Sequence, residues 1–190
     1  MVARLFGIVL AAASIVCLAD VGHCQSPSDN KAAGVNRMLD ALRNAPDQRS
    51  AAALEEQVEQ SWLQAGSPAV TLLMSQGLRL LAAGQDQGAI ESFTDAIILS
   101  PEVAEAWRQR AMAKYHAGDS AGAVQDLQET LKREPRDFAA FRTLADIAAA
   151  REDWKSAYSA WQKVMELDPK IEGGDARLKE LKRKAVGEET

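Results

Sequence analysis

The sequence predicts an all-α protein built as a linear array of packed helix pairs. Three observations predict it: a composition poor in aromatic residues, a repeat of 34 residues between positions 70 and 171, and a proline at the same place in each copy. Apolar residues make up 47% of the chain, but only four Phe, four Trp and two Tyr occur. A β-sandwich would need more β-branched and aromatic residues, whereas small residues suit close helix contacts.

Five positions keep their character in all three copies of the repeat, with no insertion or deletion. In order they are large, small, alanine, large and proline: Leu73, Trp107 and Phe141; Gly77, Ala111 and Ala145; Ala89, Ala123 and Ala157; Phe93, Leu127 and Trp161; Pro101, Pro135 and Pro169. Small residues let two helices approach, large ones fill the space beside them, and proline ends a helix.

Each copy therefore predicts two helices joined by a short turn. The copies are 70–103, 104–137 and 138–171; their first helices cover about 70–83, 104–117 and 138–151, and their second helices about 86–99, 120–133 and 154–167. Gly84 and Gly118 stand in the turns, where a left-handed backbone favours glycine. The third copy has Glu152 there, which predicts a tighter or slightly strained turn. Asp119 and Ser120 are expected N-caps.

The N-terminus reads as a targeting segment. "MVAR" is positively charged and residues 5–19 are an apolar run of 15, which is short for a membrane span and suits a signal peptide. Residues 1–24 are expected to be a signal peptide or a short anchor, with cleavage after Ala19 or Cys24. Residues 25–34 are expected to be a flexible spacer.

Helical patterns flank the repeats on both sides. Residues 35–69 predict a degenerate helix pair that acts as an N-terminal cap. The pair is degenerate because Glu55 and Glu59 fall at or near positions where the repeat requires apolar residues. Residues 172–190 predict a capping helix and tail. That helix would be N-capped by Asp175 and carry the apolar stripe Leu178, Leu181 and Ala185.

The period of 34 with these columns resembles the tetratricopeptide repeat (TPR), and the whole layout is similar to exported TPR proteins of Gram-negative bacteria. The resemblance implies an α-solenoid with a concave groove lined by the first helix of each repeat. Transferred by position, the partner-binding groove comprises Met74, Leu78, Glu105, Arg108, Gln109, Met112, Tyr115, Arg142 and Asp146.

Arg108 and Arg142 share one repeat position, so they would face the same space and suit a carboxylate of a partner. The alternative is that each pairs locally, Arg108 with Glu105 and Arg142 with Asp146. TPR grooves that hold chaperone tails carry asparagines, and the groove positions here have none. That difference argues against a chaperone-tail receptor.

The stretch "GDSAG" at residues 118–122 fits a serine-hydrolase motif centred on Ser120. A hydrolase would need a strand before Gly118 and a histidine base, but the stretch before Gly118 predicts a helix. The chain's two histidines are His23 and His116. No catalytic residue is therefore predicted. The mature body would hold one histidine and no cysteine, so no metal site and no cofactor are expected.

These patterns predict a non-enzymatic protein-interaction module in the bacterial cell envelope, exported to the periplasm, that binds a peptide or helix of a partner. Net charge of −5 disfavours nucleic acid, and no small-molecule substrate is expected. The first alternative is a membrane-tethered assembly factor for an envelope or respiratory complex, with residues 5–21 retained as an anchor. A serine hydrolase using Ser120 is the second.

Overall fold

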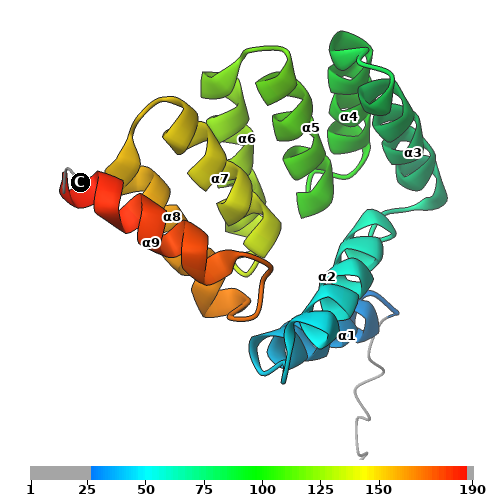
Figure 1. Cartoon of the computed structure of the whole chain (residues 1–190). Helices are drawn as coiled ribbons and strands as arrows, with labels where there is room; N and C mark the ends of the chain where they lie inside the picture. The colour runs from blue at the N-terminus through cyan, green and yellow to red at the C-terminus, as the bar shows by residue number, and fades with distance from the viewer. Residues whose placement is uncertain (1–26, 188–190) are drawn as a thin grey trace, which may run out of the picture.

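The computed structural model describes residues 27–187; the predicted signal segment 1–24 lies outside them. The described residues form nine α-helices and no strand, and the seven helices of residues 68–186 follow one another in sequence order along a curved array (Figure 1). The helices are α1 (Pro27–Arg43), α2 (Gln48–Leu63), α3 (Pro68–Ala82), α4 (Asp86–Leu99), α5 (Ala104–His116), α6 (Ser120–Arg133), α7 (Phe138–Ala150), α8 (Trp154–Leu167) and α9 (Gly174–Val186).

The three predicted repeats are the antiparallel pairs α3–α4, α5–α6 and α7–α8. In each pair the first helix lies on one side of the array and the second on the other (Figure 1). The second helices begin and end at the predicted residues. Helix α3 begins two residues early, at Pro68, because Ser67 accepts a hydrogen bond from the Val70 amide and proline suits a first helical turn.

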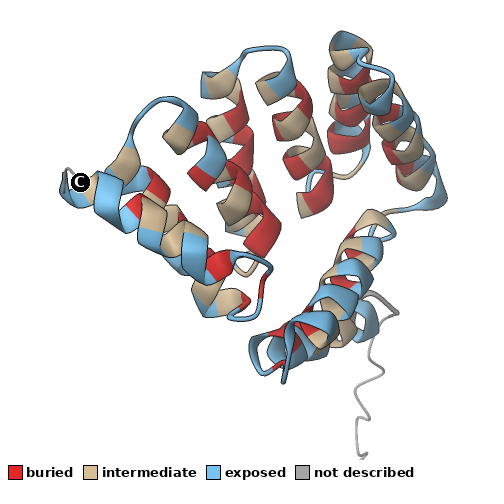
Figure 2. Cartoon of the chain, viewed as in Figure 1, coloured by how far each residue is buried: buried red, intermediate tan, exposed pale blue. Residues whose placement is uncertain are grey.

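Three of the five predicted columns form the buried core, whereas Leu73, Trp107 and Phe141 are half-buried against it and the three prolines are exposed. Ala89, Ala123 and Ala157 are fully buried, and the buried positions follow the helix faces that meet inside the array (Figure 2). The first pair is in close contact at Gly77 and Phe93: a Cβ on Gly77 would lie 2.5 Å from the phenyl Cε1. This glycine is therefore needed for close approach of α3 and α4.

The turns confirm the predicted backbone. Gly84 and Gly118 are left-handed, with φ of 69° and 88°, and Glu152 is forced into the same region with φ of 59°. The Asp119 carboxylate accepts a hydrogen bond from the Gly122 amide at 2.8 Å, so it is the N-cap of α6. Ser120 is instead the first helical residue. "GDSAG" is thus a helix-to-helix turn.

The C-terminal helix α9 covers the last repeat. Its Leu181 is buried in one cluster with Trp161 and Val164, and the Trp161 indole donates a hydrogen bond to the Gly174 carbonyl at 3.0 Å. The predicted cap differs: the N-cap residue is Gly173, with φ of 68°, and Asp175 lies inside the first turn. At that position the negative charge of Asp175 still interacts favourably with the positive end of the helix dipole.

The first helix differs from its predicted extent. Helix α1 begins at Pro27, so residues 27–34 are helical although they were expected to belong to the spacer 25–34. Proline is well suited to a first helical turn because it has no amide hydrogen to leave unsatisfied. Nothing between it and Val35 obliges the helix to stop.

The α1–α2 hairpin also lies in a different place from the expected N-terminal cap. It turns back across the N-terminal ends of α5 and α7 instead of stacking on the outer face of α3 (Figure 1). Its Leu42, Val58 and Trp62 share one buried cluster with Phe138 and Ala139 of α7. The outer face of α3 leaves Leu72 65% exposed.

We expect Phe93→Ala to lower the free energy of unfolding by about 3–5 kcal/mol, because it leaves a cavity against Gly77. Urea denaturation measures this loss. Ile98→Ala on the same helix, at a side chain 72% exposed, should change it by less than about 0.5 kcal/mol. Equal losses would contradict the assigned core.

We expect Glu152→Gly to raise the free energy of unfolding by about 0.5–1 kcal/mol, because glycine adopts a left-handed backbone without a Cβ clash. Gly118→Ala at the equivalent turn should lower it by about 1 kcal/mol. Thermal melts of the two variants give opposite shifts if the third turn carries the strain.

Candidate binding groove

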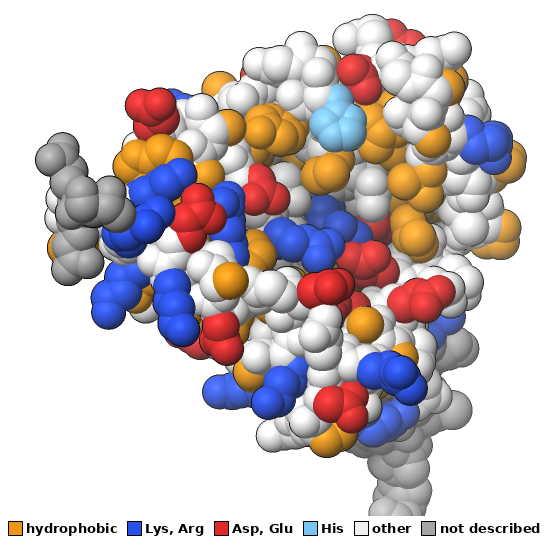
Figure 3. Space-filling view, in the orientation of Figure 1, with side chains coloured by type: hydrophobic (Ala, Val, Ile, Leu, Met, Phe, Trp, Pro, Cys, Tyr) orange, Lys and Arg blue, Asp and Glu red, His pale blue; other side chains and the backbone are white. Residues whose placement is uncertain are grey.

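The predicted groove residues lie on the first helices α3, α5 and α7, which share one side of the array. The α5 and α7 faces meet there, since the Thr143 hydroxyl lies 3.5 Å from the Met112 sulfur. On this side acidic and basic side chains gather at the centre, beside a hydrophobic area (Figure 3). The groove therefore has a charged part and an apolar part.

The two parts differ in accessibility. Met74, Glu105 and Arg108 are buried, so these predicted contacts do not face open solvent. Met74 belongs to the core cluster of α3 and α4, against which Leu63 of α2 also packs. The other predicted residues are half-buried or exposed: Leu78, Gln109, Met112, Tyr115, Arg142 and Asp146.

Arg108 is held by its own chain. Its guanidinium donates hydrogen bonds of 2.8 and 3.0 Å to Glu105 and lies 3.5 Å from Asp137, so the local pairing is confirmed for this arginine. Gln109 donates to the same Glu105 carboxylate at 2.7 Å. Burial raises the pKa of Glu105 to about 7, with Arg108 opposing, and burial likewise raises the pKa of Asp137.

Arg142 does not pair with Asp146. Its guanidinium lies 3.7 Å from both Glu55 and Glu59 of α2, whereas Asp146 lies 3.6 Å from Arg177 of α9. Arg108 and Arg142 are thus occupied by acids of this chain in the structure. The guanidinium pair expected to await a partner's carboxylate already faces the carboxylates of α2.

The hairpin is fixed to the array at two further points. The Trp62 ring lies 5.7 Å from the Phe138 ring and 6.0 Å from the Arg108 guanidinium carbon. Arg136, just before α7, donates to Asp40 at 2.6 Å and to the Asn36 side chain at 2.7 Å. One helix of the chain therefore occupies the charged part of its own groove.

This interface leaves polar groups unsatisfied. Among the described residues, the buried side-chain atoms without a hydrogen-bond partner are Trp62 Nε1 and Asp168 Oδ2. Both lie where α2 meets the array, since Asp168 follows α8 and faces Glu55. Leaving such a group unpaired costs about 1–3 kcal/mol. The docked hairpin is therefore less stable than its apolar contacts alone would make it.

The pKa of Glu55 is raised to about 7, chiefly by burial and then by the neighbouring Asp168 carboxylate, while Arg142 opposes the shift. Burial also raises the pKa of Asp168. Neighbouring carboxyls resist ionising together. We therefore expect the docked hairpin to favour the protonated form of Glu55.

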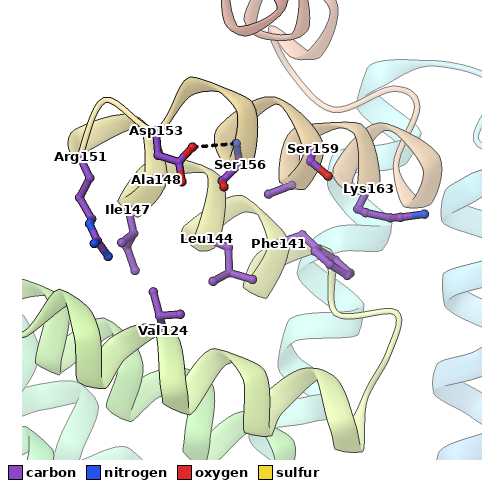
Figure 4. A pocket seen from close by; sticks show the side chains of 11 residues that line it. Val124, Phe141, Leu144, Ile147, Ala148, Arg151, Asp153, Ser156, Ser159 and Lys163 are labelled. Carbon is purple, nitrogen blue, oxygen red and sulfur yellow. Dashed lines mark hydrogen bonds between the residues drawn. The ribbon is translucent and has the colours of Figure 1, made fainter. Parts of the chain in front are cut away.

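A second hollow of about 550 Å³ lies between α6 and the α7–α8 pair, away from the groove residues (Figure 4). Its apolar wall carries Val124, Phe141, Leu144 and Ile147, with Arg151 and Lys163 at its edge. The dashed hydrogen bond in Figure 4 runs from the Ser156 amide to Asp153, the N-cap of α8. Sequence reasoning predicted no hollow here.

Residues 27–187 also bear on metal binding and on membrane spans. No three His, Cys, Asp or Glu side chains there are grouped so that they could hold a metal ion. None of the helices in that part combines the length and apolar character that crossing a membrane requires.

The chain is similar to several TPR proteins. No family model matches the chain. A TPR repeat-containing protein of Rhizobium etli is 23% identical over 156 residues, covering 82% of this chain and 76% of the relative. Mouse tetratricopeptide repeat protein 36 is 43% identical over 56 residues, and the chain spans only 30% of its length.

Solved structures agree on the fold. The first TPR domain of Spaghetti (RPAP3), bound to an HSP90 peptide, has a TM-score of 0.60 at 19% identity, over 65% of this chain and 97% of that one. MamA has a TM-score of 0.56 at 18% identity, over 86% and 90%. With the 34-residue register and the three packed helix pairs, these matches show that the chain has the tetratricopeptide repeat fold.

We expect Arg142→Glu to release the hairpin, because it replaces attraction to Glu55 and Glu59 by repulsion. Amide exchange in α2 should quicken about fivefold, the equivalent of about 1 kcal/mol for partly exposed ion pairs. Exchange in α4 should not change. Arg151→Glu, at the end of the same helix and away from the hairpin, is the matched control.

We expect hairpin docking to weaken as the pH rises through about 7, since the docked Glu55 has a pKa above the ordinary carboxyl value. Its contribution is complete below the ordinary carboxyl pKa and is lost near neutrality. Spin labels at exposed Gln57 and Gln162, in a chain with Cys17 and Cys24 replaced by serine, report the distance between α2 and α8.

The long-distance population should grow between about pH 6 and 8. Glu55→Gln keeps the side chain's size and removes its titration. A pH response that persists in this variant would contradict the assignment to Glu55.

Proposed function

We propose that this chain is a non-enzymatic protein-binding module that holds a segment of another protein in its concave groove. The observation that carries the proposal is the apolar part of the groove, where Leu78, Met112 and Tyr115 are only half-buried on α3 and α5. Apolar side chains held on a rigid curved scaffold are what a peptide or helix ligand needs. The RPAP3 TPR domain, whose structure includes an HSP90 peptide, supports the same use of this fold.

The groove combines two kinds of contact. The apolar area on α3 and α5 adjoins Gln109 and the guanidinium group of Arg142, whose side chain is 38% exposed. A ligand that fits both would place apolar side chains over α3 and α5 and an acidic group over α7. The expected partner of the groove is accordingly a protein segment with both acidic and apolar residues.

We further propose that the module works in the cell envelope after export. The support is the positively charged start "MVAR" followed by the apolar run 5–19, the pattern of a signal peptide. Mass spectrometry of the native N-terminus tests this. A chain beginning at Asp20 or Gln25 supports export with cleavage, whereas a retained 5–21 segment supports the membrane-tethered assembly factor instead.

In-cell photo-crosslinking tests the groove. A benzophenone amino acid replacing Tyr115 on α5 should capture a partner that mass spectrometry identifies, and Met112→Glu should abolish the capture by placing a charge among apolar contacts. The control is the same reagent at Tyr158 on α8, a second helix, which lies on the side of the array opposite the first helices (Figure 1). Identical captures from both positions would overturn the groove assignment.

A further inference from the structure

We propose that the α1–α2 hairpin is a built-in ligand of the groove, and that the groove's partner is an acidic amphipathic helix with an aromatic residue that displaces α2. This inference rests on the proposed function and names the chemistry of its ligand. The hairpin already occupies the charged part of the groove, so its own contacts report what that surface recognises.

The contacts of α2 come from one face of the helix. Glu55, Glu59 and Trp62 are spaced by four and three residues, which places them in line on a helix surface. The two glutamates face Arg142, each at 3.7 Å. The indole covers Arg108 and packs on Phe138. Two acids and one aromatic ring thus match a basic, partly apolar surface.

The hairpin can leave without unfolding the array. Leu39, Leu42, Ala51 and Val58 give it a packed interior of its own between α1 and α2. It joins α3 through the short connection 64–67. The repeats pack on one another through separate buried clusters that contain no residue of the hairpin among their fully buried members.

The docked state is also incompletely satisfied. Trp62 Nε1 and Asp168 Oδ2 are buried without partners, and the Glu55 and Asp168 carboxyls are held together. A partner helix that supplied a hydrogen-bond donor to Asp168, kept its acids clear of that carboxylate and buried no unpaired indole N–H would bind the same surface with fewer unpaired groups. The half-buried Leu78, Met112 and Tyr115 on α3 and α5 give such a helix a first contact before α2 leaves.

A fluorescent peptide with the sequence of residues 51–63 is the probe, and its binding to the full chain is measured by anisotropy. The Trp62→Ala chain lacks the ring that anchors α2 but keeps Arg108, Arg142 and Phe138. Because apparent affinity scales with the fraction of open groove, this variant should bind the peptide at least about tenfold more tightly than the unaltered chain. Trp154→Ala, which removes a tryptophan on α8 facing α9, should leave the affinity unchanged.

Two controls make the binding test specific. A peptide with lysines at the positions of Glu55 and Glu59 should not bind. This control separates recognition of charge from nonspecific binding. Arg136→Ala releases the hairpin from the Asp40 and Asn36 side, outside the contacts of the probe, and should strengthen binding in the same direction by about threefold. Circular dichroism and thermal melting check that both variants keep the folded array.

Each outcome decides. Tighter binding to Trp62→Ala and Arg136→Ala, with the lysine peptide inactive, supports the built-in ligand. Equal binding to open and unaltered chains overturns the inference but leaves the groove as a binding surface. No binding to either overturns both the inference and the proposed groove. The unaltered chain could instead form a dimer that Trp62→Ala dissociates. That result would assign the surface to a second copy's hairpin and overturn the proposed partner.

Discussion

The array depends on close contact between a small residue on one helix and a large one on its partner. Gly77 against Phe93 is the sharpest case, because a single added carbon would overlap the ring. The second helix of each pair carries a buried alanine at the equivalent position: Ala89, Ala123 and Ala157. Since each pair meets at the same place, successive pairs rotate by a similar amount, and the first helices are brought to one side.

That side then has to accommodate the charges that its helices carry. Burial of Arg108 is tolerable only because Glu105 and Asp137 surround it, and its pKa is raised by them although burial alone would lower it. The hairpin adds Trp62 above this group and brings acids to Arg142. The groove is therefore a surface whose charges are balanced from within the same molecule, which links its accessibility to the position of α2.

Much of the fold could be predicted from the sequence, because a strict period repeats local information three times. The turn at Glu152, the N-cap at Asp119 and the ends of α4, α6 and α8 follow from nearest neighbours along the chain. The groove residues followed less completely. Their positions on the first helices were predictable, but the burial of Met74, Glu105 and Arg108 was not.

The sequence by itself determined the repeat, its helix bounds and the mismatch of Glu55 and Glu59 with the repeat columns, since these depend on period, turn chemistry and side-chain size. Only the tertiary structure decided where that mismatched pair goes. Arg142 and Phe138 are about 80 residues from α2 along the chain, so their attraction to Glu59 and Trp62 has no signature in any local pattern. The folded array brings them together, and the hairpin lies in the groove for that reason.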